Sequence, residues 1–296
     1  MLNKFNFGPL YIVLAAGLWA FDGVIRRNLF VLSPLQIVFF EHLVGVVFLL
    51  PIIWKLKFKY FKQVWKEVLL VALFSGLLGT ILFTAALQQV FFISFSVVFL
   101  LQKLQPIFAI GSAKIILQEK FSSYYWLWAA VALIAAFYIT FPTGSVSLSQ
   151  DGNNILAALY ALGAAFFWGT GTTFSKKILN KVDSKQATGL RFLATTFFAG
   201  LALIIFQRNN FFLPDFSQWI SLTFIALSTG MVALYIYYKG LKTTPVRLST
   251  LLELVFPVLA IMIDAVVYQS YLVPVQYISA LVLLFALSRL VKLEQR

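Results

Sequence analysis

Residues 99–110 read FLLQKLQPIFAI and residues 250–261 read TLLELVFPVLAI, and the likeness of these two stretches is the key to the architecture. Both contain the same two leucines, proline, alanine and isoleucine at matching places. The same shift of about 150 residues pairs Trp19 with Trp168, Gln36 with Gln186, Gly79 with Gly230, and Pro106 with Pro257. We therefore predict that the chain consists of two related halves.

The composition is that of a membrane protein. Of the 296 residues, 61% are hydrophobic and 11% are charged, and the mean hydropathy is +0.92, whereas soluble domains are roughly 45–50% apolar. The chain has no cysteine and one histidine, so we expect no metal site and no cofactor. Its formal charge of +13 comes from cations that lie between apolar runs, which argues against a nucleic-acid partner.

A membrane-spanning helix needs about 20 apolar residues, and the chain offers about ten such runs. They fall near residues 9–28, 34–54, 66–87, 94–117, 123–141, 154–175, 184–206, 216–238, 246–268 and 271–291. The lysine and aromatic residues of 55–66 are typical of a segment at the membrane interface. The polar stretch 143–153 is predicted to link a first five-helix repeat, 1–142, to a second, 154–296.

The placement of cations predicts the orientation. With a cytoplasmic N-terminus, the outer side receives only Arg26, Arg27 and Arg208. The remaining loop cations lie inside: Lys4, Lys55, Lys57, Lys59, Lys62, Lys66, Lys120, Lys176, Lys177, Lys181, Lys185, Lys239, Lys242, Arg247, Arg289, Lys292 and Arg296. This favours a multi-pass protein of the cytoplasmic (plasma) membrane with both termini cytoplasmic. Because five is odd, the two halves must insert with opposite orientations, which places a site near the membrane midplane. The predicted fold is therefore all-α, with about ten transmembrane helices in two inverted five-helix repeats.

Charged residues within apolar runs are costly and usually serve function. Lys103 and Glu253 each lie one turn before a paired proline. Pro106 leaves the carbonyl of Gln102 without its helical partner, and Pro257 does the same to Glu253. We predict that the two kinked midpoints meet and that Lys103, Glu253 and Gln102 bind substrate. A permanent ion pair between Lys103 and Glu253 that locks the halves together is the alternative.

Six further charged or titratable residues within the predicted spans are of functional interest. Lys114 and Asp264 fall late in their spans and could reach an interface, which leaves four as candidates: Asp22, Glu41, His42 and Arg191. Glu41 and His42 are neighbours about 100° apart on a helix, so we expect one of them to face the cavity. Either could bind and release a proton, or simply bond to neighbouring helices. Arg191 could pair with Glu41 or hold a substrate carboxylate. Asp22 could serve transport or pair with Arg26 or Arg27.

The chain resembles the drug/metabolite transporter superfamily, of the EamA-type ten-helix kind. The resemblance rests on the early tryptophan of each half, on Gly79 and Gly230, on the paired prolines, and on Glu119 before a final helix. It implies that first and third helices line the pathway, which adds four aromatic candidates: Trp19, Trp168, Tyr235 and Tyr238. Gly79, Gly230, Pro106 and Pro257 are expected to serve hinge motion or close packing.

We therefore predict a secondary-active transporter, not an enzyme, that moves a small polar metabolite by alternating access. An amino acid, an amine or a related compound is favoured as substrate, with proton coupling or exchange as the energy source and export as the direction. No nucleotide-binding P-loop, HExxH or GxSxG pattern occurs in the sequence. The alternatives are a receptor or scaffold and, less favoured, a lipid-modifying enzyme. Membrane lipids are the other expected partners of a monomer or homodimer.

Overall fold

The computed structural model describes residues 6–55, 58–89, 101–144, 152–256, 258–259, 262 and 273–294. Over these residues the chain is helical and contains no strand. The fold prediction of an all-α membrane protein is confirmed. Pro257 and most of the predicted linker 143–153 lie outside the described residues, so the linker boundaries stay predictions.

The first half follows the predicted spans closely, except that the first span is divided after Ala20 and the third span begins earlier. Its elements are α1 (Gly8–Ala20), α2 (Asp22–Arg26), η1 (Arg27–Leu29), α3 (Pro34–Trp54), α4 (Phe58–Val71), η2 (Ala72–Leu78), α5 (Gly79–Gln88), α7 (Gln105–Ser112), η4 (Ala113–Leu117) and α8 (Ser123–Thr140). The segment expected at the membrane interface is helical from Phe58 and runs directly into the third span.

The second half repeats this order. Its elements are α9 (Gly152–Leu179), α10 (Ser184–Phe206), η5 (Arg208–Asn210), α11 (Phe216–Ile225), η6 (Ala226–Val232), α12 (Ala233–Thr243), α13 (Val246–Leu252) and α15 (Pro274–Glu294). Within the described ranges, six helical segments are long and apolar enough to cross a membrane by themselves: 34–54, 59–88, 123–140, 184–206, 216–243 and 274–294.

Matched residues of the repeat start the second helix of each half in the same way. Ser33 caps α3 by accepting a hydrogen bond from the backbone N–H of Gln36, and Asp183 caps α10 by accepting one from Gln186. Such caps satisfy backbone donors that a helix leaves open at its first turn. The pairing of Gln36 with Gln186 in the repeat therefore has a local structural cause.

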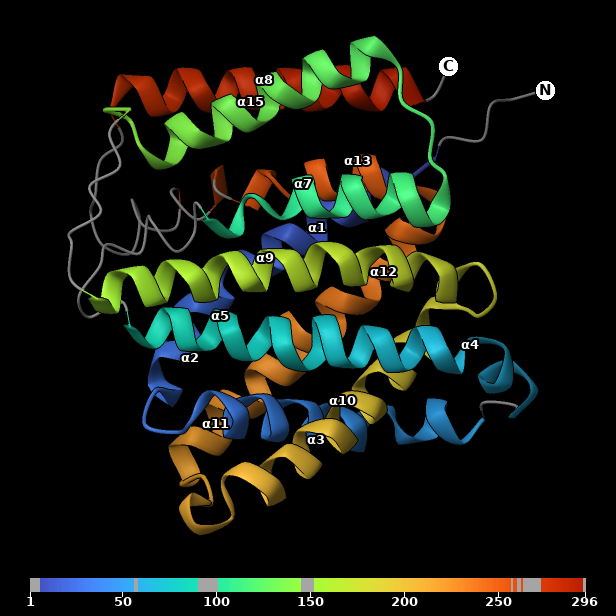
Figure 1. The fold of residues 1–296 in the computed structure, drawn as a ribbon, viewed down its shortest axis with the longest axis vertical. Coiled ribbons are helices and arrows are strands. Elements are labelled where there is room, and N and C mark those ends of the chain that lie inside the picture. The colour runs from blue at the N-terminus through green and yellow to red at the C-terminus, as the bar shows by residue number, and fades with distance from the viewer. Residues whose placement is uncertain are drawn as a thin grey trace.

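Helices pair across the halves as a two-fold relation requires. The fifth helices α8 and α15 lie together at one end of the molecule, and the second helices α3 and α10 lie together toward the other (Figure 1). The first helix of each half packs on the third span of the other, α1 on α12 and α9 on α5. The fourth helices α7 and α13 also meet. Exchanging the two halves thus leaves the set of helix contacts unchanged: equivalent helices pair with each other, and the contact of α1 with α12 becomes that of α9 with α5. This is expected of an inverted repeat.

The third spans share a second feature, a central π-helical turn. In the first half it is η2, between α4 and α5, and in the second half it is η6, between α11 and α12. A π-helical turn interrupts the regular hydrogen-bond ladder and frees carbonyl groups, which is why such turns occur at functional sites. Both turns lie at the middle of their spans.

The fourth helices are interrupted where the prolines predict. Residues 103–104 and 253–254 are turns within otherwise helical segments, so Lys103 and Glu253 lie on the breaks themselves. Pro106 is at the first turn of α7, which begins just after the break, a position where proline needs no N–H partner. Discontinuous helices at a repeat interface are a common way to build a binding site in transporters.

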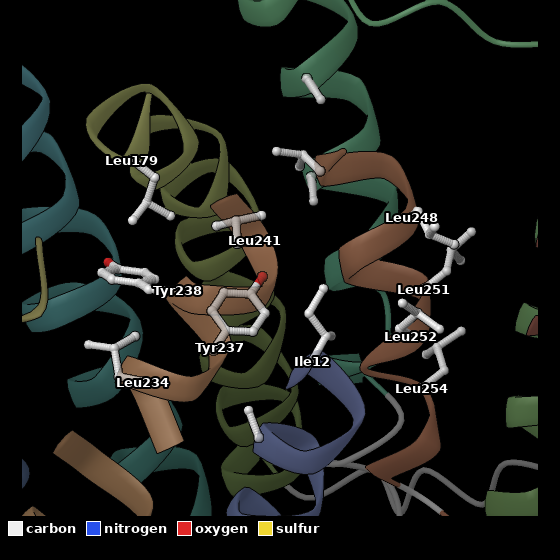
Figure 2. Close-up of a cluster of buried hydrophobic side chains, with 14 of the residues drawn as sticks. Ile12, Leu179, Leu234, Tyr237, Tyr238, Leu241, Leu248, Leu251, Leu252 and Leu254 are labelled. Carbon is white, nitrogen blue, oxygen red and sulfur yellow. The ribbon is translucent and has the colours of Figure 1, made fainter. Parts of the chain in front are cut away.

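A continuous apolar core lies beside these breaks. Figure 2 shows part of it, with Ile12, Leu241 and Leu251 from three different helices. Glycines let the third span of the first half approach the second half closely: a Cβ added at Gly171 would collide with Ser75, and one at Gly76 with Thr195. Small residues at such crossings allow tight helix packing in membranes. The core and these crossings fix the two halves around a central space.

Candidate functional site

A cavity of about 180 Å³ lies between the two halves. Its wall combines charged, polar and aromatic groups from both repeats: Trp19, Asp22, Arg26, Glu41, His42, Ser75, Thr80, Phe83, Gln102, Lys103, Gln105, Pro106, Trp168, Thr172, Arg191, Phe192, Thr229, Gly230, Leu234, Tyr237, Thr250, Glu253, Leu254 and Phe256. A cavity lined by ring faces and a few convergent polar groups is typical of a small-molecule site.

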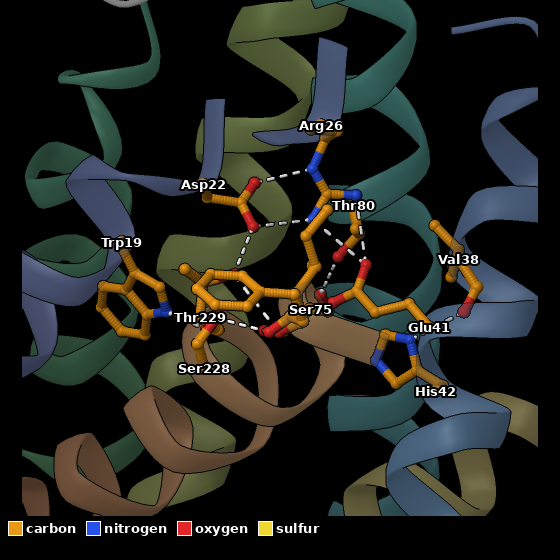
Figure 3. Close-up of polar contacts among 12 residues, drawn as sticks. Trp19, Asp22, Arg26, Val38, Glu41, His42, Ser75, Thr80, Ser228 and Thr229 are labelled. Carbon is orange, nitrogen blue, oxygen red and sulfur yellow. Dashed lines mark hydrogen bonds and ion pairs between the residues drawn. The ribbon is translucent and has the colours of Figure 1, made fainter. Parts of the chain in front are cut away.

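One wall of the cavity is a buried ionic cluster around Arg26 (Figure 3). The Arg26 guanidinium donates to Asp22 at 2.6 and 3.0 Å and to Glu41 at 3.1 Å from each of two nitrogens. Thr229 Oγ1, from the other half, donates to Asp22 at 2.6 Å. Arg26 is 3% exposed, so it is not the loop cation that the charge count assumed. Of the alternatives for Asp22, the structure shows the pair with Arg26.

Each half sends a tryptophan to the π-helical turn of the other. Trp19 Nε1 donates to the carbonyl of Thr229 at 2.9 Å, and Trp168 Nε1 donates to the carbonyl of Ser75 at 3.0 Å. These carbonyls belong to η6 and η2. Two polar contacts thus join first helices to third spans across the interface, and both indole rings face the cavity.

The Ser75 carbonyl is a meeting point for three donors. Besides Trp168, it accepts hydrogen bonds from Thr80 Oγ1 at 3.1 Å and from Arg191 Nη2 at 3.2 Å. The other terminal nitrogen of Arg191 lies 3.4 Å from the Tyr238 hydroxyl. The ion pairs of the described residues do not include Arg191, so the predicted pair with Glu41 is not formed here.

His42 and Glu41 both line the cavity, so the expectation that only one would face it is wrong. The cavity is broad enough across α3 to reach both side chains. The Nδ1 atom of His42 lies 2.8 Å from the Val38 carbonyl, so this nitrogen carries the hydrogen and Nε2 is left as the other polar atom. The imidazole also packs on the Phe192 ring, with 4.8 Å between centroids.

The two helix breaks face each other through reciprocal contacts. Lys103 Nζ lies 3.6 Å from the centroid of the Phe256 ring in the opposite half. Glu253 accepts hydrogen bonds from Gln105 Nε2 at 3.0 Å, also across the halves, and from the Tyr237 hydroxyl at 2.7 Å. Lys103 and Glu253 are absent from the ion pairs of the described part of the chain. The locking ion pair that was the alternative prediction is therefore not present in this conformation.

Most of the predicted site residues meet at this cavity. Those that line it are Trp19, Asp22, Glu41, His42, Gln102, Lys103, Trp168, Arg191 and Glu253, together with Pro106 and Gly230. Tyr235 and Tyr238 are not among the lining residues. The Tyr238 hydroxyl does accept a hydrogen bond from Arg191, which lines the cavity. Gly79 instead packs against the Trp168 ring. Whether these residues bind substrate stays a prediction.

The sequence reasoning missed several wall residues. Tyr237 rather than its neighbours reaches the cavity, and Gln105 and Thr229 contribute polar groups there. A helical period counted from Gly230, which also lines the cavity, would have favoured Tyr237 over Tyr238, because seven residues are close to two full helical turns and eight are not. The contribution of Thr229 had no such signal.

Comparisons with known proteins agree with this architecture. The sequence profile of the EamA-like transporter family matches residues 6–141 and 155–291. The riboflavin transporter ImpX of Fusobacterium nucleatum subsp. nucleatum is 35% identical over 294 residues, covering 97% of this chain and 98% of the relative. A solved structure titled only as a crystal structure of a protein superposes with a TM-score of 0.76 at 17% identity, over 97% of this chain and 98% of that one. The last likeness concerns the fold alone.

Proposed function

Because the chain belongs to the EamA-like transporter family, we propose that it is a secondary carrier that moves riboflavin, or a molecule with a similar flat ring system, across the membrane by alternating access. The coarser conclusion, a small-molecule transporter of a multi-pass membrane type, rests on the family match and on the named relative. The flavin substrate and the mode of transport are the proposal.

The cavity supports a ring-shaped substrate. Two pairs of aromatic residues contribute to its wall: Trp19 with Tyr237, at 5.2 Å between ring centroids, and Trp168 with Phe83, at 5.0 Å. Stacking of a base-like ring on an aromatic side chain is worth about 1–3 kcal/mol. The isoalloxazine ring of riboflavin offers a large face for such stacking, and its ribityl chain carries hydroxyl groups that suit polar side chains.

Opposed charges in the wall balance in a way that suits an uncharged substrate. Three cations, Arg26, Lys103 and Arg191, face three carboxylates, Asp22, Glu41 and Glu253. A substrate without net charge therefore enters without upsetting the balance. Lys103 and Glu253, which form no ion pair with each other in the described part of the chain, would also suit the two charged ends of a zwitterion, which keeps an amino acid as the second candidate substrate.

The Arg26 cluster supports coupling to protons. It holds two buried carboxylates against one guanidinium, so it carries an excess negative charge that a proton could neutralise during transport. Exchange of one substrate for another is the alternative energy source. Export as the favoured direction, the plasma membrane with both termini cytoplasmic, and a lipid-surrounded monomer or homodimer remain parts of the proposal.

Binding and transport of riboflavin can be measured separately. In detergent, titrating the purified protein with riboflavin should quench flavin fluorescence in a saturable way, because stacking on indole rings quenches it. In proteoliposomes loaded with unlabelled riboflavin, labelled riboflavin should accumulate by counterflow faster than in protein-free liposomes. A panel of amino acids, amines and nucleosides serves as competitor.

The contrary outcomes are clear. A folded protein that neither quenches flavin fluorescence nor exchanges riboflavin would overturn the flavin proposal. Counterflow of an amino acid in the same liposomes would then favour the zwitterion. Failure of every compound to exchange or to raise the melting temperature would instead favour a receptor or scaffold.

A further inference from the structure

We propose that Arg191 is the residue that recognises the carbonyl edge of the flavin ring, with Trp168 beside it as the stacking surface. This inference rests on the proposed flavin substrate and adds which edge of the ring the protein recognises and which residue forms the hydrogen bonds to it. The edge in question is the pyrimidine side of the isoalloxazine, which carries two carbonyl oxygens and one N–H.

The first observation is a donor without a partner. Arg191 Nε is buried and has no hydrogen-bond partner among the described residues. The guanidinium has five N–H donors, and its hydrogen bonds within the described part of the chain are the two to Ser75 and Tyr238. Buried polar groups are almost always paired, so an unpaired donor in the wall of a cavity marks a place where a ligand supplies the acceptor.

The second observation is the position of Trp168. Its indole nitrogen and Arg191 Nη2 both donate to the Ser75 carbonyl, at 3.0 and 3.2 Å. Because they share this acceptor, the two donor nitrogens lie within about 6 Å of each other. Both come from the second half and meet at the π-helical turn η2 of the first half. A flat ring that stacks on Trp168 would bring one edge to the guanidinium, and a planar fork of donors suits carbonyl oxygens on such an edge.

The third observation is that the other two cavity cations make different kinds of contact. Arg26 is held by Asp22 and Glu41. Lys103 lies over the Phe256 ring. Arg191 is thus the cavity arginine with a free donor and no carboxylate partner among the described residues. Lys103 has no carboxylate partner there either, but its ammonium lacks the planar fork of donors that suits two carbonyl oxygens.

The wall also offers unpaired groups of the opposite kind. Gln102 Oε1 is a buried acceptor without a partner in the described part of the chain, and Thr250 Oγ1 is likewise unpaired there. A ligand that satisfies the cavity must therefore present donors as well as acceptors. Riboflavin has both, through its ring N–H and its ribityl hydroxyls, whereas a purely anionic or purely apolar ligand does not.

A comparison of riboflavin analogues tests the assignment. The probes are 2-thioriboflavin and 4-thioriboflavin, whose sulfur accepts hydrogen bonds poorly, and 8-chlororiboflavin, which is changed at the opposite edge of the ring. Wild-type protein should bind at least one thio analogue about tenfold more weakly than riboflavin, the size of a lost hydrogen bond to a charged donor. It should bind 8-chlororiboflavin about as well as riboflavin.

Three variants separate the role of Arg191 from general effects. Arg191→Gln should bind riboflavin about tenfold more weakly and lose the preference over the thio analogue. Arg191→Lys keeps the charge but lacks Nε and the planar fork, so it should lose most of the preference as well. Lys114→Gln removes an exposed cation outside the cavity wall and should keep the wild-type preference.

The outcomes distinguish this inference from the function on which it rests. If wild-type protein does not bind riboflavin, both fall. If it binds riboflavin and Arg191→Gln, with a melting temperature close to wild type, keeps the full preference, the edge assignment alone is wrong. If Arg191→Gln does not fold, the Arg191→Lys profile decides, and an unchanged preference in that variant overturns the assignment.

Discussion

Replacing Arg26 with methionine should destabilise the folded protein strongly, whereas the same change at Arg191 should have a smaller effect. Arg26 makes four charged hydrogen bonds of 2.6–3.1 Å to Asp22 and Glu41. The side chains of Arg26, Asp22 and Glu41 are 4%, 14% and 6% exposed. Without Arg26, two buried carboxylates face each other with no cation between them.

The magnitude follows from the cost of an uncompensated buried charge. Removing one partner of a buried ion pair costs about 3–5 kcal/mol. Asp22 keeps its hydrogen bond from Thr229, which offsets part of this loss. At about 2–4 °C for each kcal/mol in a chain of this size, the melting temperature should fall by roughly 10 °C. Arg191→Met loses hydrogen bonds to neutral groups only, and should cost about 1–3 kcal/mol.

Thermal unfolding in detergent, followed by tryptophan fluorescence, measures the difference between the two arginines. A triple variant, Asp22→Asn with Arg26→Met and Glu41→Gln, supplies the matched control, because replacing a whole buried network with neutral groups is far less costly than breaking it. The triple variant should recover more than half of the fall in melting temperature that Arg26→Met causes. If Arg26→Met melts with wild-type protein, or if the triple variant is no more stable than the single one, the electrostatic reasoning is refuted.

Two further predictions test packing and capping. Gly79→Ala should destabilise the protein by about 1–3 kcal/mol and weaken flavin binding, because the added Cβ would lie 2.5 Å from the Trp168 ring. Gly111→Ala is the control: a Cβ added there has no neighbouring atom within 4 Å, so the variant should be as stable as wild type or slightly more stable. Glu119→Ala should cost about 1–3 kcal/mol, because Glu119 accepts two backbone N–H groups at the start of α13, at 2.8 and 3.1 Å.

Both predictions are measured as shifts in melting temperature. For the carboxylate, Glu67→Ala is the control, since its pair with the 43% exposed Lys181 is 3.8 Å long and should be worth at most about 1 kcal/mol. Equal shifts for Glu119→Ala and Glu67→Ala would contradict the capping role. A Gly79→Ala variant as stable as Gly111→Ala would show that Trp168 can move aside freely.

The helix breaks are an example of a structural feature that the nearby sequence predicts. Proline removes a backbone donor and clashes with the preceding turn, so Pro106 predicted an interruption near Lys103, and the structure has one at 103–104. Gln36 and Gln186 were matched by the repeat alone, and both turned out to be partners of helix caps. These features depend on residues within one or two turns, and the sequence shows them directly.

Partners across the halves were harder to predict. Lys103 and Glu253 have opposite charges and matched surroundings, yet Lys103 lies over an aromatic ring and Glu253 accepts from Gln105 and Tyr237. Arg26 appeared to be a loop cation because it lies at the very end of the first apolar run, 9–28. It is buried because the first helix stops at Ala20 and a separate short helix, α2, carries Arg26 back toward Glu41.

The sequence by itself determined the membrane environment, the ten apolar segments, the repeat, and the positions of the breaks, since each depends on composition or on spacing along one helix. The tertiary structure alone decided which charges meet and which donors stay unpaired. The reason is physical, because the rotation of a helix about its axis and its register against a neighbour are set by packing across the interface. The contacts that set them join residues far apart in the chain, such as Trp19 with Thr229, 210 positions apart, and Ser75 with Arg191, 116 positions apart.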